Sequence, residues 1–306
     1  MDNLNVNLAG VKLKNPFMPA SGTAAYGENL AQHMNLNDLG AMVIKSTTLN
    51  PKIGHPWPTT VETIGGWLNA VGLKNPGLHE VLTNRLPWLK TNYPDLPIIG
   101  SVAGDTLDEY VQVSQEIDRA VNVKILEINI SCPNVANGGL EFGTDPKIVE
   151  ELTYKIKQVT KKPVFMKLSP GVTDIVEIAQ AAERGGCDGF TMINTLMGME
   201  IDLKIRKPHL SNGTGGLSGA AIHPIAVRMI HQVRQCTNLP IIGAGGVFSA
   251  EDAMELMLAG ANAIQVGSAT YGNPKALNNL ITNFAQQMHK YNFNSLKDFE
   301  TYWESI

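Results

Sequence analysis

The chain has 306 residues, of which 43% are hydrophobic and 17% charged, and its formal net charge at pH 7 is −4. This composition is typical of a globular protein and excludes a disordered chain, because enough apolar side chains are present to form a core. The sequence shows no basic stripe, no apolar run of the roughly 20 residues that a membrane span needs, and no apolar leader, so we expect a cytoplasmic protein with no nucleic-acid or membrane partner.

The first predicted element is a β-hairpin. Residues Leu4–Leu8 and Val11–Leu13 alternate between apolar and polar types on either side of Ala9 and Gly10, as two strands joined by a tight turn do. Eight short apolar runs follow, and continuous runs of this kind are typical of parallel strands buried on both faces. The runs are Phe17–Ser21, Ala41–Lys45, Pro97–Val102, Ile125–Ile130, Pro163–Leu168, Gly189–Asn194, Pro240–Ala244 and Ala263–Gly267.

Longer segments between these runs carry apolar residues at helical spacing. They are Thr106–Arg119, Asp145–Val159, Asp174–Arg184, Ile222–Gln235, Ala250–Leu258 and Lys275–Tyr291. Four of them follow a residue whose short polar side chain is a predicted N-cap: Asp105, Thr144, Thr173 and Ser249. Alternating strands and helices predict a (β/α)8 TIM barrel that spans residues 1–306 as one domain, with the N-terminal β-hairpin at its bottom. Residues 47–76 and 195–219 form two connections long enough to be active-site loops.

Polar residues gather where the predicted strands end, and barrel enzymes build their active sites there. Two of them, Lys45 and Lys167, need an anion or an electron-rich partner if they are buried. A lysine that reaches solvent at the rim is the plainer interpretation of each one, but it is weaker for two lysines beside several amides. The strand ends carry Ser21, Lys45–Ser46, Ser101, Asn129, Lys167, Asn194–Thr195, Gly245–Gly246 and Gly267–Ser268.

Glycines at the ends of the seventh and eighth strands favour a phosphate site. Gly245–Gly246 and Gly267–Ser268 occupy the positions where barrels recurrently bind phosphate through backbone N–H groups. Tight turns that need a positive φ are the alternative. No dinucleotide fingerprint is present, so a mononucleotide cofactor with one phosphate fits better than a directly bound NAD.

The three cysteines are too few and too scattered for a disulfide framework, a zinc site or an iron–sulfur cluster within this chain, so we expect no metal. Cys187 and Cys236 lie in apolar settings and are predicted to fill the core. Cys132 has polar neighbours in a loop after the fourth strand, which makes it a candidate catalytic thiol. The histidines, including His55 and His223, avoid the strand ends, so we expect surface or packing roles for them.

Motifs over nearly the whole chain resemble the class 1 dihydroorotate dehydrogenases. They are residues 17–22 (FMPASG), 45–48 (KSTT), 69–77 (NAVGLKNPG), 129–135 (NISCPNV), 167–170 (KLSP), 193–195 (INT), 215–219 (GGLSG) and 243–247 (GAGGV). Residues 137–146 are similar to the class 1B branch rather than to the fumarate-using 1A branch.

The resemblance implies FMN in the barrel mouth and the oxidation of dihydroorotate to orotate in pyrimidine synthesis. Cys132 would be the general base that takes the C5 proton. Ser101 stands where an asparagine is expected, so its flavin contact is lost or bridged by water. The implied FMN contacts are Ser21, Lys45, Ser46, Ser101, Asn129, Lys167, Ile193, Gly219, Gly245, Gly246, Gly267 and Ser268. The implied substrate contacts are Lys45, Asn69, Ala70, Val71, Gly72, Leu73, Asn129, Asn134, Asn194 and Thr195.

The class 1B resemblance also implies partners. A second subunit with FAD and a [2Fe–2S] cluster would pass electrons to NAD, in a heterotetramer of a homodimer of this chain with two electron-transfer subunits. Three alternatives stay open: a fumarate-using 1A-like enzyme, a dihydropyrimidine oxidoreductase, and a Schiff-base lyase or aldolase that uses Lys167 on a phosphate-binding barrel.

Overall fold

The structure is a computed structural model that describes residues 4–130, 142–303 and 305. Of the residues selected from the sequence, Cys132 and Asn134 lie outside this part of the chain. Within it, no helix combines the length and the apolar character that crossing a membrane requires.

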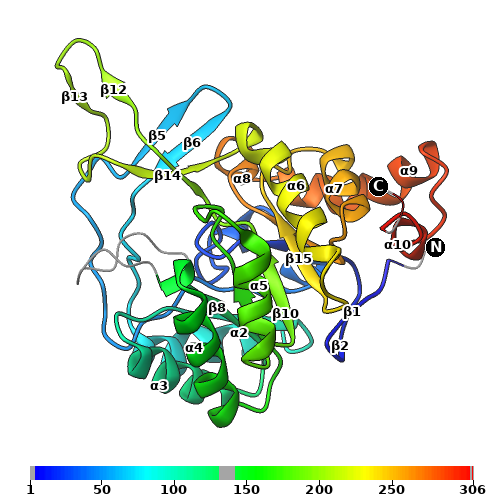
Figure 1. Ribbon diagram of the computed structural model, residues 1–306, viewed down its shortest axis with the longest axis horizontal. Coiled ribbons are helices and arrows are strands. Elements are labelled where there is room, and N and C mark those ends of the chain that lie inside the picture. Colours follow the sequence, from blue (N-terminus) through cyan, green and yellow to red (C-terminus); the bar gives the residue numbers. More distant parts are fainter. Residues whose placement is uncertain (1–3, 131–141, 304, 306) are drawn as a thin grey trace.

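The described residues contain eight parallel strands that form the predicted barrel, and their spatial order follows the chain. β3 and β4 lie side by side and nearly close it, and Gly40 donates its N–H to the Phe17 carbonyl at 2.9 Å. Helices cover the outside of the barrel (Figure 1). Apart from the exposed Lys124, the residues of these strands are buried, because side chains also fill the inside. The strands are β3 (Phe17–Pro19), β4 (Met42–Val43), β7 (Ile98–Val102), β8 (Val123–Asn129), β9 (Val164–Lys167), β10 (Gly189–Met192), β15 (Ile241–Ala244) and β16 (Ala263–Val266).

The six predicted helices all form and pack around the strands. They are α3 (Leu107–Asp118), α4 (Pro146–Val159), α5 (Ile175–Arg184), α6 (His223–Arg234), α7 (Ala250–Leu258) and α9 (Ala276–Lys290). Shorter helices lie at α1 (Leu78–Glu80), α2 (Leu86–Asn92), α8 (Ala269–Gly272) and α10 (Lys297–Glu300), with a π-helical turn at η3 (Val81–Arg85). The first strand is followed only by the 3₁₀ turns η1 (Leu30–Gln32) and η2 (Leu36–Asp38), and two further 3₁₀ turns are η4 (Phe142–Thr144) and η5 (Ala220–Ile222).

The Ser249 cap is confirmed, as part of a capping box, but three other predicted N-caps are wrong by one residue. The observed caps are Thr106, Asp145 and Asp174, in place of Asp105, Thr144 and Thr173. The carboxylate of Asp174, for example, accepts from the N–H groups of the second and third helical residues. Asp105 instead pairs with Lys52 at 2.6 Å, which leaves capping to the next side chain.

The N-terminal hairpin closes the bottom of the barrel, as predicted. Strands β1 (Val6–Leu8) and β2 (Val11–Leu13) pair antiparallel around Ala9 and Gly10, which both have positive φ. Their buried side chains pack against a layer of apolar residues inside the barrel. This "bottom layer" consists of Met18, Val43, Ile99, Ile125, Phe165, Ile242 and Ala263.

The two long connections form regular structure above the opposite end of the barrel. Their strands make a four-stranded antiparallel sheet in the order β11 (Leu196–Gly198), β14 (Gly215–Ser218), β6 (Gly66–Asn69) and β5 (Thr60–Thr63). We call it the mouth sheet. A hairpin of β12 (Ile201–Asp202) and β13 (Lys207–Pro208) extends away from it (Figure 1). Trp67 of β6 meets Tyr271 of α8 edge-to-face at 5.7 Å, so the mouth sheet contacts the barrel rim.

The two described cysteines differ, and one prediction fails. Cys187 is buried, and its burial raises the pKa of the thiol to about 12. Cys236 is exposed rather than packed in the core, because it follows the last turn of α6 and its Sγ reaches only back to the Gln232 carbonyl.

Candidate active site

A cavity of about 880 Å³ opens at the carboxyl ends of the barrel strands, beneath the mouth sheet. It brings together most of the predicted site residues, although they come from distant parts of the chain. Those that line it are Ser21, Lys45, Ser46, Asn69, Val71, Gly72, Leu73, Asn129, Lys167, Ile193, Asn194, Thr195, Gly219, Gly245, Gly246, Gly267 and Ser268. Two others, Ala70 and Ser101, are buried and do not line the cavity.

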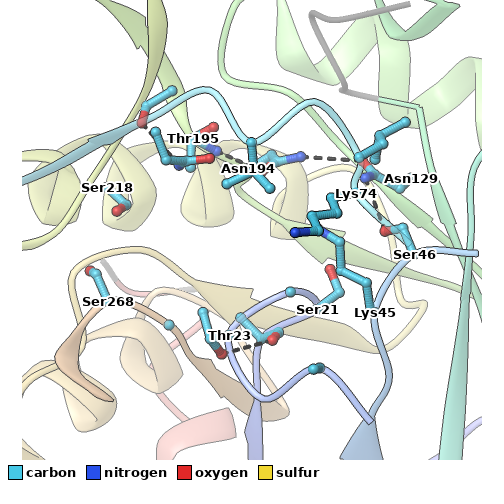
Figure 2. A pocket seen from close by; sticks show the side chains of 18 of the residues that line it. Ser21, Thr23, Lys45, Ser46, Lys74, Asn129, Asn194, Thr195, Ser218 and Ser268 are labelled. Atoms are coloured by element: carbon cyan, nitrogen blue, oxygen red, sulfur yellow. Dashed lines mark hydrogen bonds between the residues drawn. The ribbon is translucent and has the colours of Figure 1, made fainter. Parts of the chain in front are cut away.

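Hydrogen bonds join the side chains at the base of the cavity into a continuous network. Asn194 Nδ2 donates to Asn129 Oδ1, and Asn129 Nδ2 donates to Ser46 Oγ, both at 3.2 Å (Figure 2). Ser46 and Ser101 share a bond of 2.9 Å between their hydroxyls. Because each amide is fixed by its neighbours, the base of the cavity is preorganised. We call this network the polar belt: Asn194, Asn129, Ser46, Ser101, Glu127, Gln265, Lys167 and Ser21.

Lys167 ends β9, and its ammonium lies inside the belt. Its Nζ donates to Ser21 Oγ at 3.1 Å and to Gln265 Oε1 at 3.2 Å. The carboxylate of Glu127 lies 3.6 Å away. Lys167 is only 4% exposed, so water cannot solvate its ammonium fully. These partners supply the hydrogen bonds that water would otherwise give.

Ser101 was predicted to contact FMN, but it lies behind Ser46 and does not line the cavity. Its hydroxyl reaches Ser46 on one side and donates to Glu127 Oε1 at 3.2 Å on the other. A short side chain at this place leaves Ser46, rather than Ser101, at the cavity wall.

Gly245 and Gly246 form a rim with little steric freedom. Both have positive φ, at 137° and 66°. A Cβ on Gly246 would lie 2.7 Å from the Gly219 carbonyl oxygen and 2.7 Å from His223 Cβ. The two glycines are therefore required by their backbone conformation and by tight packing against neighbouring residues, and they line the cavity where the phosphate site is predicted.

His223 supports this rim from behind. Nδ1 lies 2.8 Å from the Gly245 carbonyl oxygen and Nε2 lies 3.0 Å from a Glu255 carboxylate oxygen. Both partners are hydrogen-bond acceptors, so His223 links the Gly245 main chain to Glu255 of α7. The packing role expected for His223 is thus a specific one, next to the predicted phosphate site.

The mouth sheet supplies the opposite wall. Asn69, the last residue of β6, donates from Nδ2 to the Gly216 carbonyl at 3.2 Å. The Thr195 backbone N–H donates to Asn194 Oδ1 at 2.8 Å, which links this wall to the polar belt. Leu73 and Gly72 adopt positive φ beside them. Amide and hydroxyl groups from two chain segments thus face the space above Lys167.

Cationic side chains outnumber carboxylates among the residues of the cavity wall, although the whole chain is acidic. Among the described residues that line it, Glu28 is the one carboxylate, against the cations Lys45, Lys52, Lys74, Arg85 and Lys167. Figure 2 shows Lys45 and Lys74 extending into the cavity. Burial raises the pKa of the lining residue Tyr26 to about 12 and also raises that of Tyr271, so both phenols are neutral at physiological pH. This wall suits an anionic ligand.

Three residues at the site were not selected from the sequence: Glu127, Gln265 and His223. Glu127 and Gln265 stand in apolar strand runs, each two positions before a predicted site residue, Asn129 and Gly267, and so on the same face of the strand. That two-residue period was a signal that could have identified them. The described residues contain no cluster of three or more His, Cys, Asp or Glu side chains suited to a metal.

Comparison with known proteins places this site in context. A family model described as dihydroorotate dehydrogenase matches residues 3–288. The chain is 67% identical over 302 residues (98% of this chain, 99% of the relative) to a Pediococcus pentosaceus protein provisionally named dihydroorotate dehydrogenase A (fumarate). It is 64% identical to dihydroorotate dehydrogenase A (fumarate) of Lactiplantibacillus plantarum, with 97% of each chain covered. It is 52% identical to the catalytic subunit of dihydroorotate dehydrogenase B (NAD(+)) of Latilactobacillus sakei, again with 97% of each covered.

Proposed function

Because the chain belongs to the dihydroorotate dehydrogenase family, we propose that it oxidises dihydroorotate to orotate with FMN held in the cavity at the barrel mouth. The single observation that carries the proposal is this cavity, where a buried lysine, a belt of amides and a glycine rim converge. The reaction removes a proton from C5 and a hydride from C6 of the substrate. Bound FMN supplies the two-electron acceptor for that hydride.

The residues present fit FMN. Its phosphate would lie at the rim of Gly245, Gly246, Gly267 and Ser268, which line the cavity just after β15 and β16 and could offer backbone N–H groups. The Lys167 ammonium is held at the base of the cavity, where it would favour negative charge on a reduced ring. Further contacts would come from the other lining residues of the predicted set, Ser21, Lys45, Ser46, Asn129, Ile193 and Gly219.

The remaining polar groups fit a small anionic pyrimidine. Dihydroorotate carries ring N–H groups, two carbonyls and a carboxylate, which need both donors and acceptors. Asn69, Asn129 and Asn194 provide amides, and Lys45 provides a positive charge on the same wall. Asn134 would add a fourth amide; it lies outside the described residues.

Cys132 is the proposed general base for the C5 proton. It follows Asn129, the last residue of β8, by three positions, and Asn129 lines the cavity. As a thiolate it would take the proton from C5 while the hydride leaves the adjacent carbon, C6. Negative charge then does not accumulate on the ring. Cys132 itself lies outside the described residues.

For the electron acceptor, we infer NAD, reached through a partner subunit that carries FAD and a [2Fe–2S] cluster. The similarity of residues 137–146 to the class 1B branch and the name of the Latilactobacillus relative support this acceptor. The second candidate is fumarate, which the names of the Pediococcus and Lactiplantibacillus relatives favour. A homodimer bound to two electron-transfer subunits belongs to the first candidate alone.

A Schiff-base mechanism at Lys167 is disfavoured by the geometry. Such a mechanism needs a neutral amine that is free to attack a carbonyl. Here the amine donates to two acceptors and lies 3.6 Å from the carboxylate of Glu127, so these contacts hold it in place and it is not free to attack. A borohydride-trapped substrate adduct on Lys167 would contradict our proposal directly.

Purification and two assays test the function. We expect the protein to copurify with a flavin that dihydroorotate reduces in the absence of oxygen. With an artificial dye the isolated chain should turn over, and NAD reduction should require the partner subunit. A reconstituted protein without a flavin spectrum would refute the FMN site. Strong fumarate-linked turnover by the isolated chain would instead establish the second acceptor.

A further inference from the structure

Glu127 is a carboxylate in an unusual place. It lies within β8, is 0% exposed, and sits below the cavity rather than in its wall. A buried carboxylate is costly unless it is paired and hydrogen-bonded. None of the roles proposed above for substrate or cofactor binding explains why an acid occupies this position.

The contacts of Glu127 lead to Lys167. Ser101 Oγ donates to Glu127 Oε1 at 3.2 Å, and Gln265 Nε2 donates to Oε2. The same Gln265 side chain accepts from Lys167 Nζ through its Oε1 at 3.2 Å. Gln265 thus joins the carboxylate to the ammonium, while the two charges also face each other at 3.6 Å.

Only the ammonium side of this group reaches the cavity. Lys167 and Gln265 line the cavity wall and Glu127 does not. Glu127 can therefore affect a bound ring either through Lys167 or by the electrostatic field of its own carboxylate. Two other cavity cations have carboxylate partners of their own: Lys52 pairs with Asp105 at 2.6 Å and Arg85 with Glu28 at 2.8 Å. Lys45 and Lys74 share the cavity with Lys167.

We propose that Glu127 is a positioning residue that holds the Lys167 ammonium at the base of the cavity and partly neutralises its charge, and would thereby set the reduction potential of FMN bound there. The inference rests on the proposed function. An isolated ammonium would favour the reduced, more negative ring and raise the potential. A fixed carboxylate behind it opposes that effect, since Coulomb energies are large where water is excluded.

The test is the midpoint potential of the flavin in the folded holoenzyme at neutral pH. Glu127→Gln keeps the shape of the side chain and removes its charge. We expect the potential to rise by about 30 mV or more, which corresponds to a tenfold change in the ratio of reduced to oxidised FMN affinity for a two-electron couple. Glu127→Asp keeps the charge but withdraws it by one methylene, so it should give a smaller rise.

A double-mutant cycle shows whether Glu127 acts through Lys167. In the Lys167→Met background, with FMN supplied above its dissociation constant, Glu127→Gln should change the potential by less than half as much. The physical reason is that the Gln265 bridge and the ion pair through which Glu127 acts both end on Lys167 Nζ, which methionine lacks. Asp188→Asn is the matched control, because it neutralises an acid paired with Lys157 at 2.6 Å at the opposite end of the strands, and it should leave the potential unchanged.

The outcomes separate the two proposals. An unchanged or lower potential in Glu127→Gln, or an equal shift in the Lys167→Met background, would overturn this inference. If Glu127→Gln fails to fold, an unchanged potential in Glu127→Asp does the same. A wild-type protein that binds no FMN, or whose flavin dihydroorotate does not reduce, would instead refute the proposed function. Normal flavin reduction together with an unmoved potential would refute the role of Glu127 alone.

Discussion

The two ends of the barrel are built from the same strands but differ completely in chemistry. In β9, Phe165 belongs to the bottom layer and Lys167, two residues later, belongs to the polar belt. The same change from an apolar to a polar residue two positions later occurs in three other strands. The pairs are Ile125 and Glu127, Ile99 and Ser101, and Ala263 and Gln265. Strands advance about 3.3 Å per residue, so two successive inward-facing residues lie roughly 7 Å apart along the strand. That distance separates the sealed core from the candidate site.

The two ends are also closed in different ways. At the bottom, the apolar side chains of a short hairpin pack against the bottom layer, whose residues are buried. At the mouth, the mouth sheet lies over the strand ends and leaves a cavity of about 880 Å³ between polar walls. We conclude that stability and function are divided by position along each strand, so substitutions at the two ends should have separable effects.

The largest expected effect is on stability, at the bottom. Phe165→Ala removes a fully buried ring from the bottom layer and should cost about 3–5 kcal/mol of the free energy of unfolding. Chemical denaturation measures this loss. The folded fraction should still bind FMN with nearly wild-type affinity, and a large loss of affinity in that fraction would show that the two ends are coupled.

The next effect is on rate, at the mouth. A serine hydroxyl is a much weaker acid than a thiol, so Cys132→Ser should slow flavin reduction by dihydroorotate by about 10²-fold near neutral pH. Stopped-flow absorbance gives the rate, and denaturation should show little change in stability. Reduction at the wild-type rate would remove Cys132 from the mechanism.

A pair of glycine substitutions compares the ends directly. Gly246→Ala introduces a Cβ 2.7 Å from the Gly219 carbonyl oxygen at a positive φ of 66°, so the rim must shift. We expect the dissociation constant of FMN to rise about tenfold, or 1.4 kcal/mol. Gly10→Ala is the control in the bottom hairpin, where φ is also positive but nothing lies within 4 Å of the new Cβ. It should cost only about 1 kcal/mol of stability, and equal losses of FMN affinity in both variants would contradict the division between the ends.

The smallest effect concerns two thiols on the bottom side. In a Cys132→Ser background, iodoacetamide at pH 8 should modify the exposed Cys236 quickly and leave Cys187 intact. Burial protects Cys187 sterically and raises its pKa to about 12, so the reactive thiolate is scarce. Intact-protein mass spectrometry before and after unfolding checks this order. Rapid modification of Cys187 in the native protein would indicate that this end opens.

Much of the fold followed from local pattern alone. Continuous apolar runs and helical periodicity place all eight barrel strands and six helices within a few residues of their observed bounds, because burial on two faces or on one stripe leaves a direct mark on the sequence. The cap positions failed by one residue, since neighbouring side chains such as Asp105 and Thr106 are both able to cap. Lys52, 53 positions away in the chain, decides between them by pairing with Asp105.

The candidate site was only partly contained in the sequence. Strand ends and family motifs identified Lys167, Asn129 and the glycine rim, because parallel strands deliver their ends to one place. The acid beneath them was hidden: Glu127 appears in the sequence as one polar residue within an apolar strand. Its partner Lys167 stands on the neighbouring strand β9, 3.6 Å away, but only the closed barrel brings Gln265 of β16 against both charges. The residue types can be read from the sequence, whereas the bridge that Gln265 makes between the buried charges depends on which strands face each other across the interior, and that is a property of the tertiary structure.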